Sequence, residues 1–145
     1  MKTGKTKKRI LVVENDQLNA KFFDFTLRRR AGHEVEILED VEQILERTRS
    51  GKVDLVIMDV SLSNSRYQGR DLDGPAVCRL LRSDPRTARI PILLATAHAM
   101  MGDRETLLKE SGADDYIAKP ITDPADLIGR IETLLNRQAE PAHRR

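Results

Sequence analysis

Residues 53–59, with the sequence VDLVIMD, decide how the rest of this chain is interpreted. The run is short, mostly apolar and without polar alternation, which is typical of a β-strand buried on both faces. Asp59 ends the run, and a carboxylate is unusual there because the adjoining core solvates charge poorly. Ligands bind at the carboxyl ends of the strands in an open parallel sheet. Asp59 is therefore the first candidate site residue, although a lone aspartate at such a position more often caps a turn.

Four further segments predict strands, and five segments with helical apolar spacing alternate with them. The predicted strands are residues 9–13, 34–38, 90–96 and 115–119, and the predicted helices lie in residues 17–30, 41–51, 74–84, 103–111 and 124–136. This alternation predicts an α/β fold, a doubly wound five-stranded parallel sheet with helices on both faces and right-handed crossovers. The weak alternation of residues 34–38 indicates an edge strand.

Length and composition predict one domain that is helix-rich. The chain has 145 residues, of which 33% are charged and 3% aromatic, and it contains one cysteine. One cysteine excludes an intramolecular disulfide. No apolar stretch approaches the length of a membrane span, and residues 1–9 lack the apolar core of a signal peptide. We therefore expect a cytoplasmic protein that does not enter a membrane.

The charge is distributed unevenly along the chain. The formal net charge is +2, but basic residues gather in segments 1–8 and 137–145, which we expect to be tails flanking one domain at 9–136. Without residues 1–9 and 137–145 the net charge is about −5. Binding of nucleic acid requires a basic face on the folded domain. The sequence therefore predicts no DNA partner.

Polar residues follow four of the five predicted strands. Residues 14–16 (Glu14, Asn15 and Asp16) come after the first strand, Asp59 ends the third, Thr96 the fourth and Lys119 the fifth. Because the ends of parallel strands lie on one edge of a sheet, we expect these side chains to meet in one crevice. The alternative is an ordinary ion pair between Lys119 and Asp59 with no chemical role.

This combination of groups suits a divalent cation and a phosphoryl group. Clustered carboxylates repel an incoming phosphate, and an oxygen-ligated Mg²⁺ removes that conflict. Asp59 can then act as the nucleophile. Lys119 supplies a fixed positive charge to the phosphoryl oxygens, and the Thr96 hydroxyl can donate a hydrogen bond to them.

At these motifs the sequence resembles the receiver domains of two-component response regulators, over about residues 9–136. The resemblance rests on residues 12–16 (VVEND), Met58-Asp59, Thr96-Ala97 and Lys119-Pro120. Locally it is similar to single-domain members of the DivK type. The resemblance implies a CheY-like, flavodoxin-like three-layer sandwich with strand order 2-1-3-4-5 and a cis Lys119-Pro120 bond.

The resemblance also implies the roles of several residues. Asp59 would accept a phosphoryl group from a histidine kinase or a histidine phosphotransfer protein. Thr96 and Tyr116 would form the pair of residues that changes conformation when Asp59 is phosphorylated. Such a protein is a phospho-acceptor rather than an enzyme, and it signals through contacts with a downstream protein that the sequence does not name.

The implied Mg²⁺ site departs from the family pattern. The implied ligands are Glu14, Asn15, Asp16, Asp59 and the backbone carbonyl of Ser61. The family usually has two acids after the first strand, and Asn15 occupies the second position while the acid is displaced to Asp16. An amide oxygen can bind Mg²⁺ but brings no negative charge. Either Asp16 substitutes, or the metal site is weakened.

The connection at residues 60–73 is a second departure. It shows no clear period, and Gly74, which opens the third helix, lies fifteen residues after Asp59. Ser63 stands where family members often have proline. A long loop in a compact domain is usually functional or disordered. This one either gates access of phosphate or docks a partner, or it is a tolerated surface insertion.

The leading interpretation is a single-domain response regulator of a phosphorelay, phosphorylated on Asp59. The alternative is a pseudo-receiver that binds proteins without phosphorylation, because Asn15 weakens the Mg²⁺ site. A phosphatase with an aspartate nucleophile is less favoured, since such enzymes want a second acid where Ser61 stands. A flavin mononucleotide site is also less favoured, because Glu14 and Asp16 would repel its phosphate.

Overall fold

The computed structural model describes residues 7–62, 66–97 and 101–139. Most of the two predicted tails (residues 1–6 and 140–145) and Ser63 lie outside the described residues. The elements of the main sheet are β1 (Arg9–Val13), β2 (Glu34–Leu38), β3 (Leu55–Asp59), β6 (Ile92–Thr96) and β7 (Asp115–Ala118). The helices are α1 (Gln17–Phe25), the π-helical turn η1 (Thr26–Arg30), α2 (Val41–Arg49), α3 (Gly74–Ser83), α4 (Met101–Ser111) and α5 (Pro124–Ala139). Two short strands, β4 (Arg66–Tyr67) and β5 (Arg70–Asp71), form a separate hairpin.

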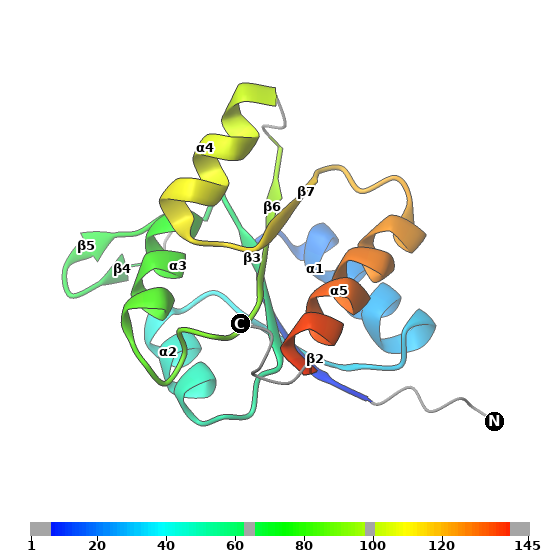
Figure 1. Cartoon of the computed structure of the whole chain (residues 1–145), viewed down its shortest axis with the longest axis horizontal. Helices are drawn as coiled ribbons and strands as arrows, with labels where there is room; N and C mark the ends of the chain where they lie inside the picture. Colours follow the sequence, from blue (N-terminus) through cyan, green and yellow to red (C-terminus); the bar gives the residue numbers. More distant parts are fainter. Residues whose placement is uncertain (1–6, 63–65, 98–100, 140–145) are drawn as a thin grey trace.

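The five main strands form one parallel sheet in the order β2-β1-β3-β6-β7. Helices α1 and α5 cover one face, and α2, α3 and α4 lie on the other (Figure 1). The predicted doubly wound sheet with order 2-1-3-4-5 is therefore confirmed, as is the edge position of residues 34–38. In the described part of the chain, no helix is both long enough and apolar enough to cross a membrane.

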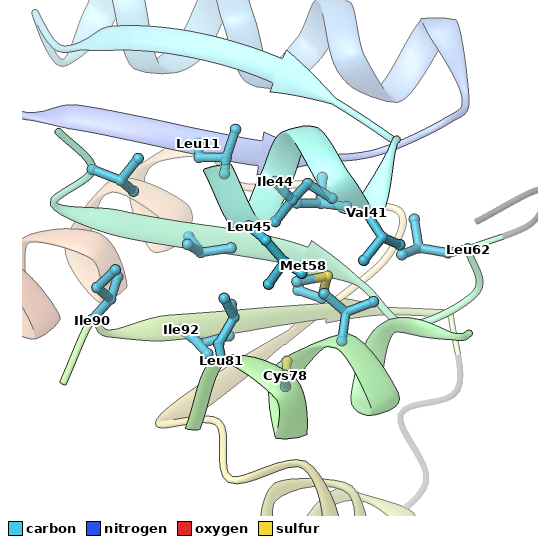
Figure 2. Packing of buried hydrophobic residues seen from close by; sticks show 14 of the residues in the cluster. Leu11, Val41, Ile44, Leu45, Met58, Leu62, Cys78, Leu81, Ile90 and Ile92 are labelled. Carbon is cyan, nitrogen blue, oxygen red and sulfur yellow. The ribbon is translucent and has the colours of Figure 1, made fainter. Parts of the chain in front are cut away.

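Strand β3 divides its side chains between the two cores of the protein. Leu55 and Ile57 pack with α1 and α5, whereas Val56 and Met58 pack with α2 and α3, because successive side chains of a strand point to opposite faces. Figure 2 shows the second of these clusters, where Met58 lies among side chains of α2 and α3. All five residues of β3 are buried, as a strand in the middle of a parallel sheet requires.

Aspartates cap three of the helices at their N-termini. The carboxylates of Asp16, Asp40 and Asp73 each accept a hydrogen bond from the backbone N–H three residues later, at 2.9, 3.0 and 3.0 Å. Such caps satisfy one of the N–H groups that a helix start leaves unpaired. The cap at Asp16 is new, and it bears on the predicted metal site.

Segment 60–73 contains more order than the sequence predicted. The expectation of an irregular connection is corrected by the β4–β5 hairpin, in which Tyr67 pairs with Arg70. Its two turn residues, Gln68 and Gly69, have φ angles of 54° and 78°. Positive φ at both positions is the geometry of a type I′ turn, which matches the twist of paired strands.

Smaller differences concern element ends. Strand β3 begins at Leu55 rather than at residue 53, and β6 begins at Ile92 rather than at residue 90. Pro91 directly before β6 has no N–H to donate, although its carbonyl accepts from Val56 N at 3.0 Å. The first predicted helix continues to Arg30, but its last five residues form η1 rather than an α-helix. The Lys119-Pro120 bond is cis, as the resemblance implied.

Candidate functional site

The register of the strands brings the acidic residues of the site together. Val13 of β1 lies opposite Met58 of β3. Glu14 and Asp59 therefore follow at the same level on neighbouring strands. Both side chains are enclosed by the protein, with 3% of each residue exposed.

The same register places the hydroxyl and the ammonium group beside Asp59. Asp59 lies opposite Ala95 of β6, and Thr96, the next residue, lies opposite Ala118 of β7. Lys119 follows β7 directly, and its backbone N–H donates to the Thr96 carbonyl at 2.7 Å. Thr96 is fully buried. The predicted site residues of four strands therefore lie on one edge of the sheet.

Lys119 joins the two buried carboxylates. Its Nζ lies 3.0 Å from Oδ1 of Asp59 and 3.6 Å from Oε1 of Glu14. Asp59 Oδ1 also accepts a hydrogen bond from the backbone N–H of Ser61 at 3.1 Å. Two carboxylates thus share one ammonium group, which leaves an excess of negative charge in a buried place.

Burial and the neighbouring Asp59 carboxylate raise the pKa of Glu14. Lys119 and the backbone N–H of Asp16, which donates to Glu14 Oε2 at 3.2 Å, oppose this rise without cancelling it. Among the described atoms, Glu14 Oε1 is buried and accepts no hydrogen bond. A cation beside this oxygen would satisfy it and relieve the repulsion between the carboxylates.

The raised pKa of Glu14 makes the free energy of unfolding depend on pH. The folded protein holds the Glu14 proton more tightly than the unfolded chain, so its contribution to stability is present below the ordinary glutamate pKa and is lost as pH rises through the folded value. We expect Glu14→Gln to remove this dependence and to stabilise the metal-free protein at pH 7. Urea unfolding at pH 4 and pH 8 in the presence of a chelator measures the free energy of unfolding of both proteins. If the difference between the two pH values is the same in Glu14→Gln as in the wild type, the interpretation is contradicted.

The predicted metal ligands are partly in place. Glu14 and Asp59 are adjacent, Asn15 follows Glu14 and is half-buried, and Ser61 follows β3 closely. One oxygen of Asp16 is committed to capping α1, so Asp16 does not stand in freely for the missing acid. Over residues 7–62, 66–97 and 101–139 there is no group of three or more His, Cys, Asp and Glu side chains that could hold a metal.

The donor set nevertheless fits Mg²⁺. The side chains of Glu14, Asp59 and Asn15 offer oxygen ligands, and oxygen is the ligand atom that Mg²⁺ prefers. Glu14 Oε1 has no hydrogen-bond partner although the Lys119 ammonium lies 3.6 Å away, so this oxygen can still take a metal ion as a ligand. The set carries one negative charge fewer than a site with an acid at position 15. We expect weaker binding for that reason.

Gly74 borders the site, and the sequence did not predict its role. Its N–H donates to the Val60 carbonyl at 3.1 Å, and a Cβ atom on Gly74 would overlap the backbone carbonyl of Asp59. The first turn of α3 therefore packs directly against the end of β3. The sequence signal was the Asp73-Gly74-Pro75 helix start, but nothing in it shows what approaches the glycine.

The predicted switch residues lie on one face of the sheet. Tyr116 is opposite Leu94, two residues before Thr96, so Thr96 and Tyr116 are diagonal neighbours. Tyr116 is half-buried, and the guanidinium carbon of Arg104 on α4 lies 4.5 Å from the centre of its ring. This cation–π contact links α4 to β7 and was not expected from the sequence.

The comparisons with known proteins identify a family. The family model of the response regulator receiver domain matches residues 10–132. The DNA-binding response regulator MtrA of Mycolicibacterium smegmatis is 36% identical over 94% of this chain and 54% of its own length. The histidine-protein kinase BarA of Escherichia coli K12 is 33% identical over 77% of this chain and 11% of its own length. The chain thus spans about half or less of these curated relatives.

A solved structure is similar over nearly the whole chain. It is the receiver domain of the sensor histidine kinase PA1611 from Pseudomonas aeruginosa PAO1, which has a magnesium ion coordinated in its active-site cleft. It is 30% identical, covers 90% of this chain and 99% of that one, and superposes with a TM-score of 0.75. Together with the family match and the five-stranded sheet, this similarity shows that the chain belongs to the family of response regulator receiver domains of two-component signalling.

Proposed function

We propose that this protein accepts a phosphoryl group on Asp59 from a histidine kinase or a histidine phosphotransfer protein. The observation that carries the proposal is the buried Asp59 carboxylate at the end of β3, held 3.0 Å from the Lys119 ammonium and beside Glu14. The family to which the chain belongs uses phosphorylation by histidine kinases in general. A purely structural ion pair would not need a second buried carboxylate next to it, one oxygen of which has no hydrogen-bond partner.

The residues of the site divide the work of the transfer. An oxygen of the Asp59 carboxylate attacks phosphorus while the bond from phosphorus to the donor nitrogen breaks, and the electron pair of that bond leaves with the donor. The Lys119 ammonium, already at Asp59, neutralises charge on the phosphoryl oxygens. The Thr96 hydroxyl at the end of β6 hydrogen-bonds the group once it is attached.

The residues that would hold Mg²⁺ are Glu14, Asn15, Asp59 and Ser61, the last through its carbonyl. The oxygen of Asp16 that does not cap α1 is a further candidate. When bound, the ion supplies positive charge against the phosphoryl oxygens and the two carboxylates. The chain itself orients Asp59 through the Ser61 N–H and keeps bulk water from its buried side.

Phosphorylation is proposed to act on protein contacts. A phosphoryl group on Asp59 would attract the Lys119 ammonium, which now pairs with the Asp59 carboxylate, and the Thr96 hydroxyl. Thr96 is a diagonal neighbour of Tyr116 on the face covered by α4. A population shift at Thr96 and Tyr116 would therefore change the surface near α4 and β7, where a downstream protein reads it.

The test is to incubate the protein with acetyl phosphate and Mg²⁺ and to reduce the product with borohydride. Reduction converts an aspartyl phosphate to homoserine, which mass spectrometry assigns to one residue. We expect homoserine at position 59 and dependence on Mg²⁺. Absence of modification, or modification at another acid, would contradict the proposal.

A second candidate function is a pseudo-receiver that binds proteins without phosphorylation. Asn15 favours it, because its amide brings no negative charge and one oxygen of Asp16 is committed to capping α1. Under this function, Mg²⁺ and acetyl phosphate leave the chain unmodified even at high concentration. The two candidates are thus separated by the same experiment.

A further inference from the structure

The β4–β5 hairpin is a built element rather than a loose insertion. The hairpin has a type I′ turn. In addition, the guanidinium of Arg66 donates hydrogen bonds to Oδ1 of Asp71 and to the carbonyl of Gly69, both at 3.1 Å. The hairpin lies at the border of the molecule next to α3, and β4 contacts α2 (Figure 1). Tyr67 packs against the core cluster that α2 and α3 share. Tyr67 and the hydrogen bonds of Arg66 therefore hold the hairpin in a defined position.

A groove runs between the hairpin and α2. Its volume is about 530 Å³. Tyr67 lines one side, and the other side is lined by Glu42, Leu45, Glu46 and Arg49 of α2 and by Ser50, the residue that follows this helix. Tyr67 is half-buried, so part of its ring faces this space. The groove therefore combines an aromatic wall and an aliphatic floor at Leu45 with a charged rim.

The unpaired charges of the rim are negative. Arg49 is paired with Asp84, whose carboxylate lies 3.0 Å from its guanidinium and 2.9 Å from that of Arg86. Glu42 and Glu46 are exposed, and neither makes an ion pair with any residue that the structure describes. They stand one helical turn apart, so both carboxylates border the same side of the groove. The opening thus carries two acids without an ion pair, beside one arginine that shares its carboxylate partner, above an apolar floor.

We propose that this groove docks a basic segment of a partner protein through an arginine or lysine side chain. The aliphatic stem of such a side chain fits the floor at Leu45 and the ring of Tyr67, and its charged group meets Glu42 and Glu46. An anionic partner is disfavoured by the two acids, and a wholly apolar one would leave them desolvated and unpaired. The inference does not rest on phosphorylation of Asp59, since the groove exists in the unmodified protein.

The test is a titration of the full ¹⁵N-labelled chain with the peptide acetyl-Ala-Leu-Arg-Leu-Ala-amide, followed by NMR. The control peptide carries citrulline in place of arginine, which keeps the shape and removes the charge. We expect saturable shifts confined to α2 and the hairpin with the arginine peptide and much smaller ones with citrulline. Equal shifts with the two peptides, or no saturable shifts, would overturn the proposal.

Charge variants locate the contact. The double variant Glu42→Gln, Glu46→Gln is expected to weaken binding of the arginine peptide at least about fivefold, since two exposed ion pairs are removed. The matched control Glu105→Gln, Glu110→Gln removes the same charge from exposed positions on α4 and should leave the affinity within about twofold. Equal weakening in both double variants would mean general attraction to an acidic surface and would refute a specific groove.

Discussion

The variant Asp59→Asn is expected to lose phosphorylation by acetyl phosphate, with a decrease of at least about a hundredfold in the initial rate, because the nucleophile itself is removed. The amide has nearly the same shape as the carboxylate but does not attack phosphorus. The fold should be retained. Burial and the repulsion by Asp59 both raise the pKa of Glu14, and the substitution removes that repulsion. Radiolabel from a phosphorus-labelled donor, quantified against time, measures the effect.

The matched control for this variant is Asp54→Asn near the opposite end of β3. Asp54 pairs with Arg9, whose backbone N–H and Nε lie 2.8 and 3.2 Å from its Oδ2, far from the ends of the strands where Asp59 lies. This variant should be slightly less stable but should be phosphorylated at the wild-type rate. A similar loss of phosphorylation in both variants would show that Asp59 has no special role.

Gly74→Ala is expected to lower the free energy of unfolding by about 2–3 kcal/mol. The added methyl group would overlap the backbone carbonyl of Asp59, and backbone atoms cannot move aside as a flexible side chain does. Either α3 shifts away from β3, or the end of β3 moves. Because Asp59 ends that strand, the variant should also be phosphorylated more slowly. Urea denaturation gives the stability, and the phosphorylation assay gives the second effect.

Gly129→Ala is the control with the opposite sign. Gly129 lies in α5, is exposed, and has no atom within 4 Å of an added Cβ. Alanine favours the helix over glycine by up to about 1 kcal/mol, so this variant should be more stable than the wild type. The same chemical change is thus expected to destabilise at one position and stabilise at the other. Two variants of equal stability would show that α3 does not approach Asp59 as described.

The sheet and the positions of Asp59, Thr96 and Lys119 could be predicted because they depend on local patterns. A continuous apolar run predicts a buried strand, and the sequence shows directly which polar residue ends that run. Parallel order then places all these ends on one edge. The same reasoning did not require any knowledge of which side chains touch.

The features that escaped prediction depend on contacts between distant segments or on strands too short to show a period. Each strand of the hairpin has two residues, so no alternation is visible, and Gln68-Gly69 is a weaker turn signal than Asn-Gly. Asp16 was ambiguous because one carboxylate suits both a helix cap and a metal. The stacking of Arg104 on Tyr116 and the approach of Gly74 to Asp59 follow only from the packed structure.

The most direct test of the central claim is Mg²⁺-dependent binding of beryllofluoride, which mimics the phosphoryl group, to the wild type, Asp59→Ala and Asn15→Asp. We predict that the wild type binds it only with Mg²⁺, that Asp59→Ala does not bind it, and that Asn15→Asp binds at a lower Mg²⁺ concentration because a third carboxylate joins Glu14 and Asp59. Binding that persists in Asp59→Ala would contradict the assignment of the acceptor. Failure of the wild type to bind at saturating Mg²⁺, with binding in Asn15→Asp, would identify a receiver fold whose metal site is disabled.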